Sequence, residues 1–124
     1  MATKELLNLW SGSKSFQEVL ENVERKKDCR ISINGLDGSA RSYFMASLVF
    51  FSRRPVLIVT ADYGQSEKLY SDLTVLFPGR VELIPARELF VNTEILSRSE
   101  DYQQQRLQCL EKLYLGYNGI YIVS

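Results

Sequence analysis

Hydrophobic residues near the start of the chain recur with the spacing of helices. Over residues 16–26 they fall on one face of a helix, and Ser15 followed by Glu18 forms a capping-box pattern at its start. Before this helix, the leucine-rich stretch 5–10 predicts a short helix or a packing arm. Residues 1–29 are therefore predicted to form an N-terminal helical arm.

From residue 30 onward, short apolar runs alternate with longer helical stretches. The runs predict four strands, at Arg30–Asn34, Val56–Val59, Val81–Ile84 and Ile120–Val123. The second run, Val-Leu-Ile-Val, has no polar position, which is typical of a central parallel strand buried on both faces. The intervening stretches predict three helices, over residues 39–51, between Asp62 and Pro78, and between Ser97 and Leu115.

Local signals mark the ends of two of these helices. Asp62 with Gln65, and Ser97 with Glu100, are start signals, because each pairs a capping side chain with a Glu or Gln three residues later. Gly116 is a typical residue just past a helix end, where the backbone turns left-handed. These signals support the division into alternating strands and helices.

The alternation predicts an α/β fold with a parallel sheet of about four strands flanked by helices, a three-layer sandwich with right-handed crossovers. Residues 30–124 are enough for a single domain of this kind. The last predicted strand coincides with the end of the sequence. We therefore expect a fragment of a much larger multidomain protein.

The charge and cysteine content exclude several classes of function. The chain of 124 residues has 15 basic and 15 acidic residues, whereas a dedicated nucleic-acid-binding domain usually has a basic excess. It has no histidine and two cysteines, which excludes a Cys/His zinc site and a histidine-dependent catalytic triad. Cys29 and Cys109 are predicted to be small, buried, reduced thiols, and without a signal peptide the predicted location is cytoplasmic.

The stretch Ile31–Ser42 has the outline of a phosphate loop, which runs Gly, four residues, Gly-Lys-Ser/Thr between a strand and a helix. Gly35 takes the first position and Ser42 the last, but Ala40 replaces the second glycine and Arg41 the lysine. The alanine methyl group obstructs close approach of a phosphate to the backbone. A guanidinium is also larger than an ammonium and does not simply replace it. The loop is therefore predicted to be degenerate.

Other residues of the loop have opposite effects on phosphate binding. Asp37 adds a negative charge that would repel a phosphate by about 4 kcal/mol at 4 Å with an effective dielectric constant of 20. Gly38, Ser39 and the helix N-terminus could still hold a sulfate or phosphate weakly. A simpler interpretation is that Gly35–Gly38 only forms a strand-to-helix turn in an unrelated α/β fold. No cofactor, catalytic residue or metal ligand is predicted in this chain.

Four segments, in order, resemble the bacterial transcription-repair coupling factor (Mfd) family. The residues Gly-Leu-Asp-Gly-Ser-Ala-Arg-Ser at Gly35–Ser42 resemble the degenerate phosphate loop near its N-terminus, typically Gly-Leu-x-Gly-Ser-Ala-Arg. Arg54–Asp62 resembles its Arg-Pro-Val-Leu-Val-Val-Thr run. Leu83–Phe90 resembles its Phe-Pro-x-Trp-Glu-Thr-Leu-Pro segment, and Ser99–Leu107 its Asp-x-x-x-x-Arg-Leu helix start.

The resemblance implies the first P-loop-like α/β domain of a module similar to UvrB, the damage-binding helicase subunit of nucleotide excision repair. The implied parent is a DNA translocase that uses ATP to displace stalled RNA polymerase and recruits UvrA. It would bind UvrA, RNA polymerase and double-stranded DNA mostly through other domains, and its later motor domains would bind ATP and Mg²⁺. This chain is then expected to be a non-catalytic scaffold.

Two alternatives belong to other classes of function. The first is a divergent P-loop NTPase or kinase that uses Arg41 in place of the lysine. The second is single-stranded DNA binding through exposed aromatic side chains such as Tyr63, Phe90 and Tyr102, which in an α/β domain are more often packing residues.

Overall fold

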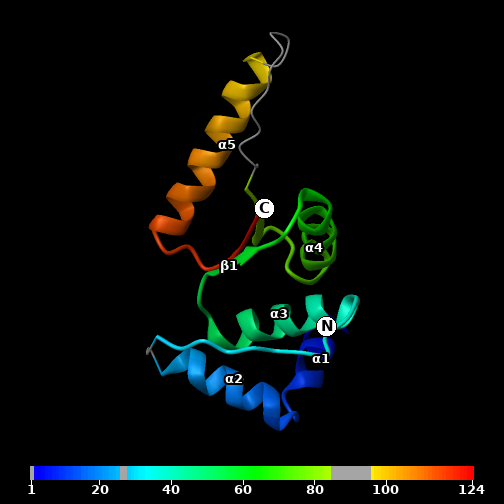
Figure 1. Ribbon diagram of the computed structural model, residues 1–124. Helices are drawn as coiled ribbons and strands as arrows, with labels where there is room; N and C mark the ends of the chain where they lie inside the picture. The colour runs from blue at the N-terminus through cyan, green and yellow to red at the C-terminus, as the bar shows by residue number, and fades with distance from the viewer. Residues whose placement is uncertain (1, 26–27, 85–95) are drawn as a thin grey trace.

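The computed structural model describes residues 2–25, 28–84 and 96–124 (Figure 1). Its helices are α1 (Ala2–Leu7), the 3-10 helix η1 (Asn8–Trp10), α2 (Lys14–Glu24), α3 (Ser39–Ser52), α4 (Tyr63–Leu76) and α5 (Leu96–Tyr114). Its strands are β1 (Val56–Val59), β2 (Val81–Leu83) and β3 (Ile120–Val123). The described part of the chain contains no helix with the length and apolar content needed to cross a membrane.

The three strands form one parallel sheet in the order β1-β3-β2. The α/β fold with helices flanking a small parallel sheet is thus confirmed, with three described strands instead of about four. The last strand in the sequence, β3, is the central one, and Ile120 and Ile122 are completely buried there. Connections that return through a helix allow the strands to remain parallel.

Helices α3 and α4 cover one face of the sheet. Ala46 and Val49 from α3 and Leu73 from α4 pack against alternate residues of the strands, which include Ile58 and Ile120. Leu73 is completely buried. This cluster is the main hydrophobic core, because all three strands contribute side chains to it.

Helix α5 lies on the opposite face, where Cys109 and Leu113 pack against Tyr121 of β3. The β1 part of this face is open, since Leu57 is 49% exposed and Val59 is 72% exposed. The prediction of a central strand buried on both faces was therefore wrong for β1, which is an edge strand. An uninterrupted apolar run does not specify which strands pair with it.

The segment Arg30–Asn34 is not a strand, contrary to prediction. Its two apolar side chains, Ile31 and Ile33, are 41% and 44% exposed. In Figure 1 the segment is drawn near α2 and α3, away from the sheet. Strand propensity reflects packing on a half-buried pleated surface, and this segment has no such surface beneath it.

The N-terminal helices pack against α3. Phe16 and Leu20 of α2 form a second hydrophobic cluster with Phe44 of α3, and the Phe16 and Phe44 rings meet edge to face with centroids 5.5 Å apart. The Ser47 hydroxyl of α3 donates to the Leu7 carbonyl oxygen at 3.0 Å. The division into an arm of residues 1–29 and a domain of residues 30–124 stays a prediction.

Helix ends follow local signals in some places and depart from them in others. Asp62 Oδ1 accepts a hydrogen bond from Gln65 N at 2.9 Å, which confirms the predicted cap of α4. At α2, however, Ser13 is the capping residue and the helix begins at Lys14, so the predicted capping box at Ser15 was wrong. Helix α5 begins at Leu96 and therefore includes the predicted cap residue Ser97.

Candidate functional site

The loop that leads into α3 turns on two glycines with positive φ angles, 85° at Gly35 and 54° at Gly38. Gly38 occupies the N-cap position without a side-chain hydrogen bond. Glycine adopts such angles at little cost, whereas an L side chain is strained there. The predicted turn between residue 34 and α3 is present, but the strand expected before it is absent among the described residues, so the strand–loop–helix frame of a phosphate loop is not formed.

Backbone amides at the start of α3 already have partners within the loop. The Ala40 amide donates to the Asp37 carbonyl oxygen at 3.2 Å, and the Arg41 amide donates to the Gly38 carbonyl oxygen at 3.3 Å. A phosphate loop holds its anion with amides directed at the phosphate oxygens. In this conformation these two amides are directed along the turn.

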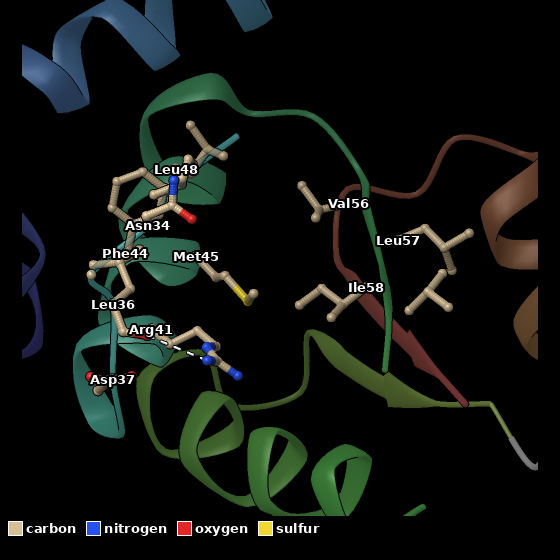
Figure 2. A pocket seen from close by; sticks show the side chains of 13 residues that line it. Asn34, Leu36, Asp37, Arg41, Phe44, Met45, Leu48, Val56, Leu57 and Ile58 are labelled. Atoms are coloured by element: carbon tan, nitrogen blue, oxygen red, sulfur yellow. Dashed lines mark hydrogen bonds between the residues drawn. The ribbon is translucent and has the colours of Figure 1, made fainter. Parts of the chain in front are cut away.

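The two charged residues of the loop are both exposed. The Arg41 guanidinium donates through Nη2 to the Leu36 carbonyl oxygen at 3.4 Å. Figure 2 shows the guanidinium extending toward β1, while Asp37 lies on the opposite side of the loop. The arginine is thus bonded to the backbone of its own loop.

Ser42 occupies the position of the hydroxyl that binds Mg²⁺ in a working phosphate loop. Its side chain is buried, with 2% of the residue exposed. Its Oγ donates to Asp72 Oδ2 of α4 at 3.0 Å. Sequence reasoning missed Asp72, because the pair is separated by 30 residues and no local motif connects them. The hydroxyl therefore joins two helices of the core.

A cavity of about 620 Å³ lies between this loop, α3 and β1. Figure 2 shows Met45 of α3 and Val56 and Ile58 of β1 pointing toward one another across it, with Arg41 at the end nearer Ile58. Leu48 lines the other end. The walls on α3 and β1 are thus apolar, whereas the loop side of the cavity carries the polar side chains of Asn34, Asp37 and Arg41.

The remaining loop positions add no reactive group. Ser39 begins α3 and is exposed, and Ala40 is half-buried. Residues 2–25, 28–84 and 96–124 contain no group of three or more acidic or cysteine side chains that could hold a metal ion. The assignment of no catalytic, cofactor-binding or metal-binding residue stays a prediction.

The other candidate residues are spread over the molecule. Tyr63 begins α4 and Tyr102 lies on α5, both with about half of their surface exposed, while Phe90 lies outside the described residues. Cys109 is buried as predicted, whereas Cys29 is exposed, so the prediction of two buried thiols was wrong for Cys29. Tyr63 and Tyr102 therefore lie on two different helices, neither of which contains the loop.

A cluster of ionisable groups connects β2 with α5. Lys112 donates a hydrogen bond to Glu82, and this bond together with the carboxylate charge raises the pKa of Lys112. Burial, and then the Glu82 charge, raise the pKa of the Cys109 thiol. Burial also raises the pKa of Tyr121, whose hydroxyl donates to the Tyr117 carbonyl oxygen at 2.9 Å. These contacts attach α5 to the sheet.

The sequence is similar to two groups of DNA-repair proteins. It is 37% identical over 83 residues to the transcription-repair-coupling factor of Bacillus subtilis (strain 168), covering 66% of this chain and 7% of that protein. It is 29% identical over 121 residues to UvrABC system protein B of Helicobacter acinonychis (strain Sheeba), covering 86% of this chain and 18% of that protein. The same protein of Mycoplasma mobile (strain ATCC 43663 / 163K / NCTC 11711) is 31% identical over 70 residues, which are 56% of this chain and 10% of that protein.

No protein-family model and no solved structure matches the chain. The chain spans less than a fifth of the length of each of these relatives, so the similarity concerns one segment of a long protein. The chain is homologous to the transcription-repair coupling factor and to UvrB, consistent with a UvrB-homology module of the coupling factor's N-terminal region.

Proposed function

We propose that this chain is a non-catalytic scaffold domain of a transcription-repair coupling factor. The observation that carries the proposal is the hydrogen bond from Ser42 to Asp72, because it uses the one hydroxyl that a phosphate loop needs for Mg²⁺. Instead of binding Mg²⁺, the hydroxyl connects α3 to α4, and both helices cover the sheet. The residue is thus retained for structure.

The rest of the loop supports the same proposal. The Ala40 and Arg41 amides are bonded within the loop, and Arg41 is bonded to the Leu36 carbonyl oxygen. To bind a nucleotide the loop would have to break these bonds, and it would also bring the triphosphate near Asp37. Each step costs free energy, because a lost hydrogen bond is worth about 1 kcal/mol and like charges repel.

In this proposal the parent protein displaces stalled RNA polymerase with ATP and recruits UvrA. Contacts with UvrA, RNA polymerase and double-stranded DNA belong mostly to other domains, as do ATP and Mg²⁺. The parent acts in the cytoplasm. This domain supplies a folded support against which the neighbouring domains pack.

Isothermal titration of the chain with Mg-ATP tests the proposal. We expect no heat of binding at ATP concentrations up to about 1 mM, which corresponds to a binding free energy weaker than about −4 kcal/mol. The double variant Ala40→Gly/Arg41→Lys is the matched control, because it restores the loop sequence while Ser42 remains bonded to Asp72. It should also fail to bind.

Micromolar binding of Mg-ATP by the natural chain would contradict the scaffold role. Phosphate release that disappears in Arg41→Ala would favour the alternative of a divergent NTPase that uses this arginine.

A further inference from the structure

The sheet face that α5 covers is open over β1. Leu57 of β1 is in register with Tyr121 of β3 and, through it, with Glu82 of β2, and both of these residues contact α5. Figure 2 shows Leu57 on the side of β1 that points away from α3. Because side chains alternate along a strand, Val59 points to the same side as Leu57. Both residues are apolar and exposed on a face that α5 covers elsewhere.

Helix α5 carries an apolar stripe on the flank next to this open area. Lys112 bonds to Glu82, so that side of α5 lies toward β2. Leu107, Leu110 and Tyr114 lie about 140–200° around the helix from Lys112, since successive residues are about 100° apart. These three residues, the α5 stripe, are 66%, 43% and 90% exposed. The α5 stripe is therefore on the flank away from β2, which is the β1 side.

The shape and spacing of this surface fit a helix. Steps of three and four residues, as in the α5 stripe, are the spacing at which one helix packs along another. Packed helices lie about 8–10 Å apart and neighbouring strands about 4.8 Å, so one helix covers about two strands. Helix α5 covers β2 and β3, which leaves room over β1 for one more helix.

The connections of the sheet indicate where such a helix would come from. Crossovers between parallel strands are right-handed. From β1 to β2 the chain crosses the sheet with α4 on one face, and from β2 back to β3 it crosses with α5 on the other face. A crossover from β3 to the outer side of β1, which no described strand occupies, continues in the second direction. It would therefore also run on the α5 face, directly over β1.

We propose that an amphipathic helix of the parent protein, from the polypeptide that follows β3, packs beside α5 over the open face of β1. The inference rests on the proposed function, in which the chain is one domain of a longer protein; the chain covers 7% and 18% of the length of two relatives. A helix in the same polypeptide has an effective concentration on the order of 1 mM, which favours it over a separate partner. Its apolar side chains contact Leu57 and Val59 below it and the α5 stripe beside it.

Hydroxyl-radical footprinting of the natural chain and of the parent protein tests this contact. The oxidation rate of a side chain follows its exposed area, and Tyr114 is 90% exposed in the chain. Burial in the core of an interface should therefore slow the oxidation of Tyr114 about tenfold in the parent.

A pair of matched variants gives a second measurement. Leu107→Asp should shift the melting temperature of the natural chain by less than about 2 °C, because Leu107 is exposed there. In the parent it places an unpaired carboxylate in the contact and should lower the melting temperature of this domain by about 5 °C or more. Val75→Asp, at an exposed position of α4, is the control and should shift both proteins by less than about 2 °C.

Four outcomes would overturn the inference. Tyr114 could be oxidised at equal rates in the chain and in the parent, or Leu107→Asp and Val75→Asp could have equal effects on the parent. Tyr114 could be protected in the parent only when a separate protein is added. It could also be protected in the natural chain by a second copy, which a concentration-dependent sedimentation rate would reveal.

Failure of the scaffold role gives a different result. Mg-ATP binding by the natural chain, together with slow oxidation of Tyr114 in the parent, would remove the scaffold role and support the helix contact.

Discussion

The hydrogen bond between Ser42 and Asp72 should stabilise the fold measurably, and Ser42→Ala tests this directly. Ser42 is 2% exposed, so water cannot replace its bond, while Asp72 is half-buried and can recover part of its hydration. A hydrogen bond to a charged group contributes about 1.5–3 kcal/mol when it is buried. With one partner half-buried, we expect the variant to lose about 1–2 kcal/mol of unfolding free energy.

A double-mutant cycle separates this bond from other effects of each substitution. Urea unfolding followed by far-UV circular dichroism would be measured for the natural chain, Ser42→Ala, Asp72→Ala and the double variant. With a urea slope of about 2 kcal/mol per M, a loss of 1–2 kcal/mol lowers the midpoint by about 0.5–1 M. We expect a coupling free energy of about 1–2 kcal/mol between the two positions.

Ser47→Ala is the matched control, because Ser47 is also a buried serine of α3 but donates to the Leu7 carbonyl oxygen. It should destabilise the chain and be additive with Asp72→Ala within about 0.5 kcal/mol. If Ser42→Ala were equally additive with Asp72→Ala, the Ser42 hydroxyl would not be held by the carboxylate in solution. It would then be free to bind Mg²⁺, and the reasoning for a scaffold would fail.

Two further predictions concern stability. The pKa values of Cys109 and Lys112 are raised in the folded chain from 9.0 and 10.5, by burial and by the Glu82 hydrogen bond respectively. Above about pH 9 the unfolded chain therefore binds fewer protons than the folded chain, so the melting temperature should fall as the pH rises through that range. A melting temperature that stays constant or rises between about pH 8 and pH 11 would contradict this. Leu73→Ala should lose about 2–5 kcal/mol of unfolding free energy, measured in urea, because Leu73 is completely buried. Val75→Ala, on the exposed side of α4, should lose less than about 0.5 kcal/mol. Equal losses in the two variants would refute the described core.

The sequence predicted those features that depend on neighbouring residues. The runs Val56–Val59 and Ile120–Val123 are strands with the predicted bounds, because several consecutive apolar β-branched residues favour a buried strand wherever it pairs. The cap of α4 by Asp62 was also predicted, since its partner is only three residues away.

Features that depend on distant residues were not predictable in this way. The edge position of β1 follows from its pairing with β3, which is more than 60 residues away in the chain. Arg30–Asn34 has the composition of a strand but lies outside the sheet. At the candidate site, the loop residues were identified from their motif, but the bond of Ser42 to Asp72 required the packing of α3 on α4.

Helix α3 belongs to two hydrophobic clusters, and this has a consequence for how the chain unfolds. Ala46 and Val49 contact the sheet cluster, whereas Phe44 contacts α2 through Phe16. Removing residues 1–29 would therefore uncover Phe44 on a helix that also supports the sheet. The arm and the α/β domain should lose their native-state hydrogen-exchange protection together, as a single cooperative unit.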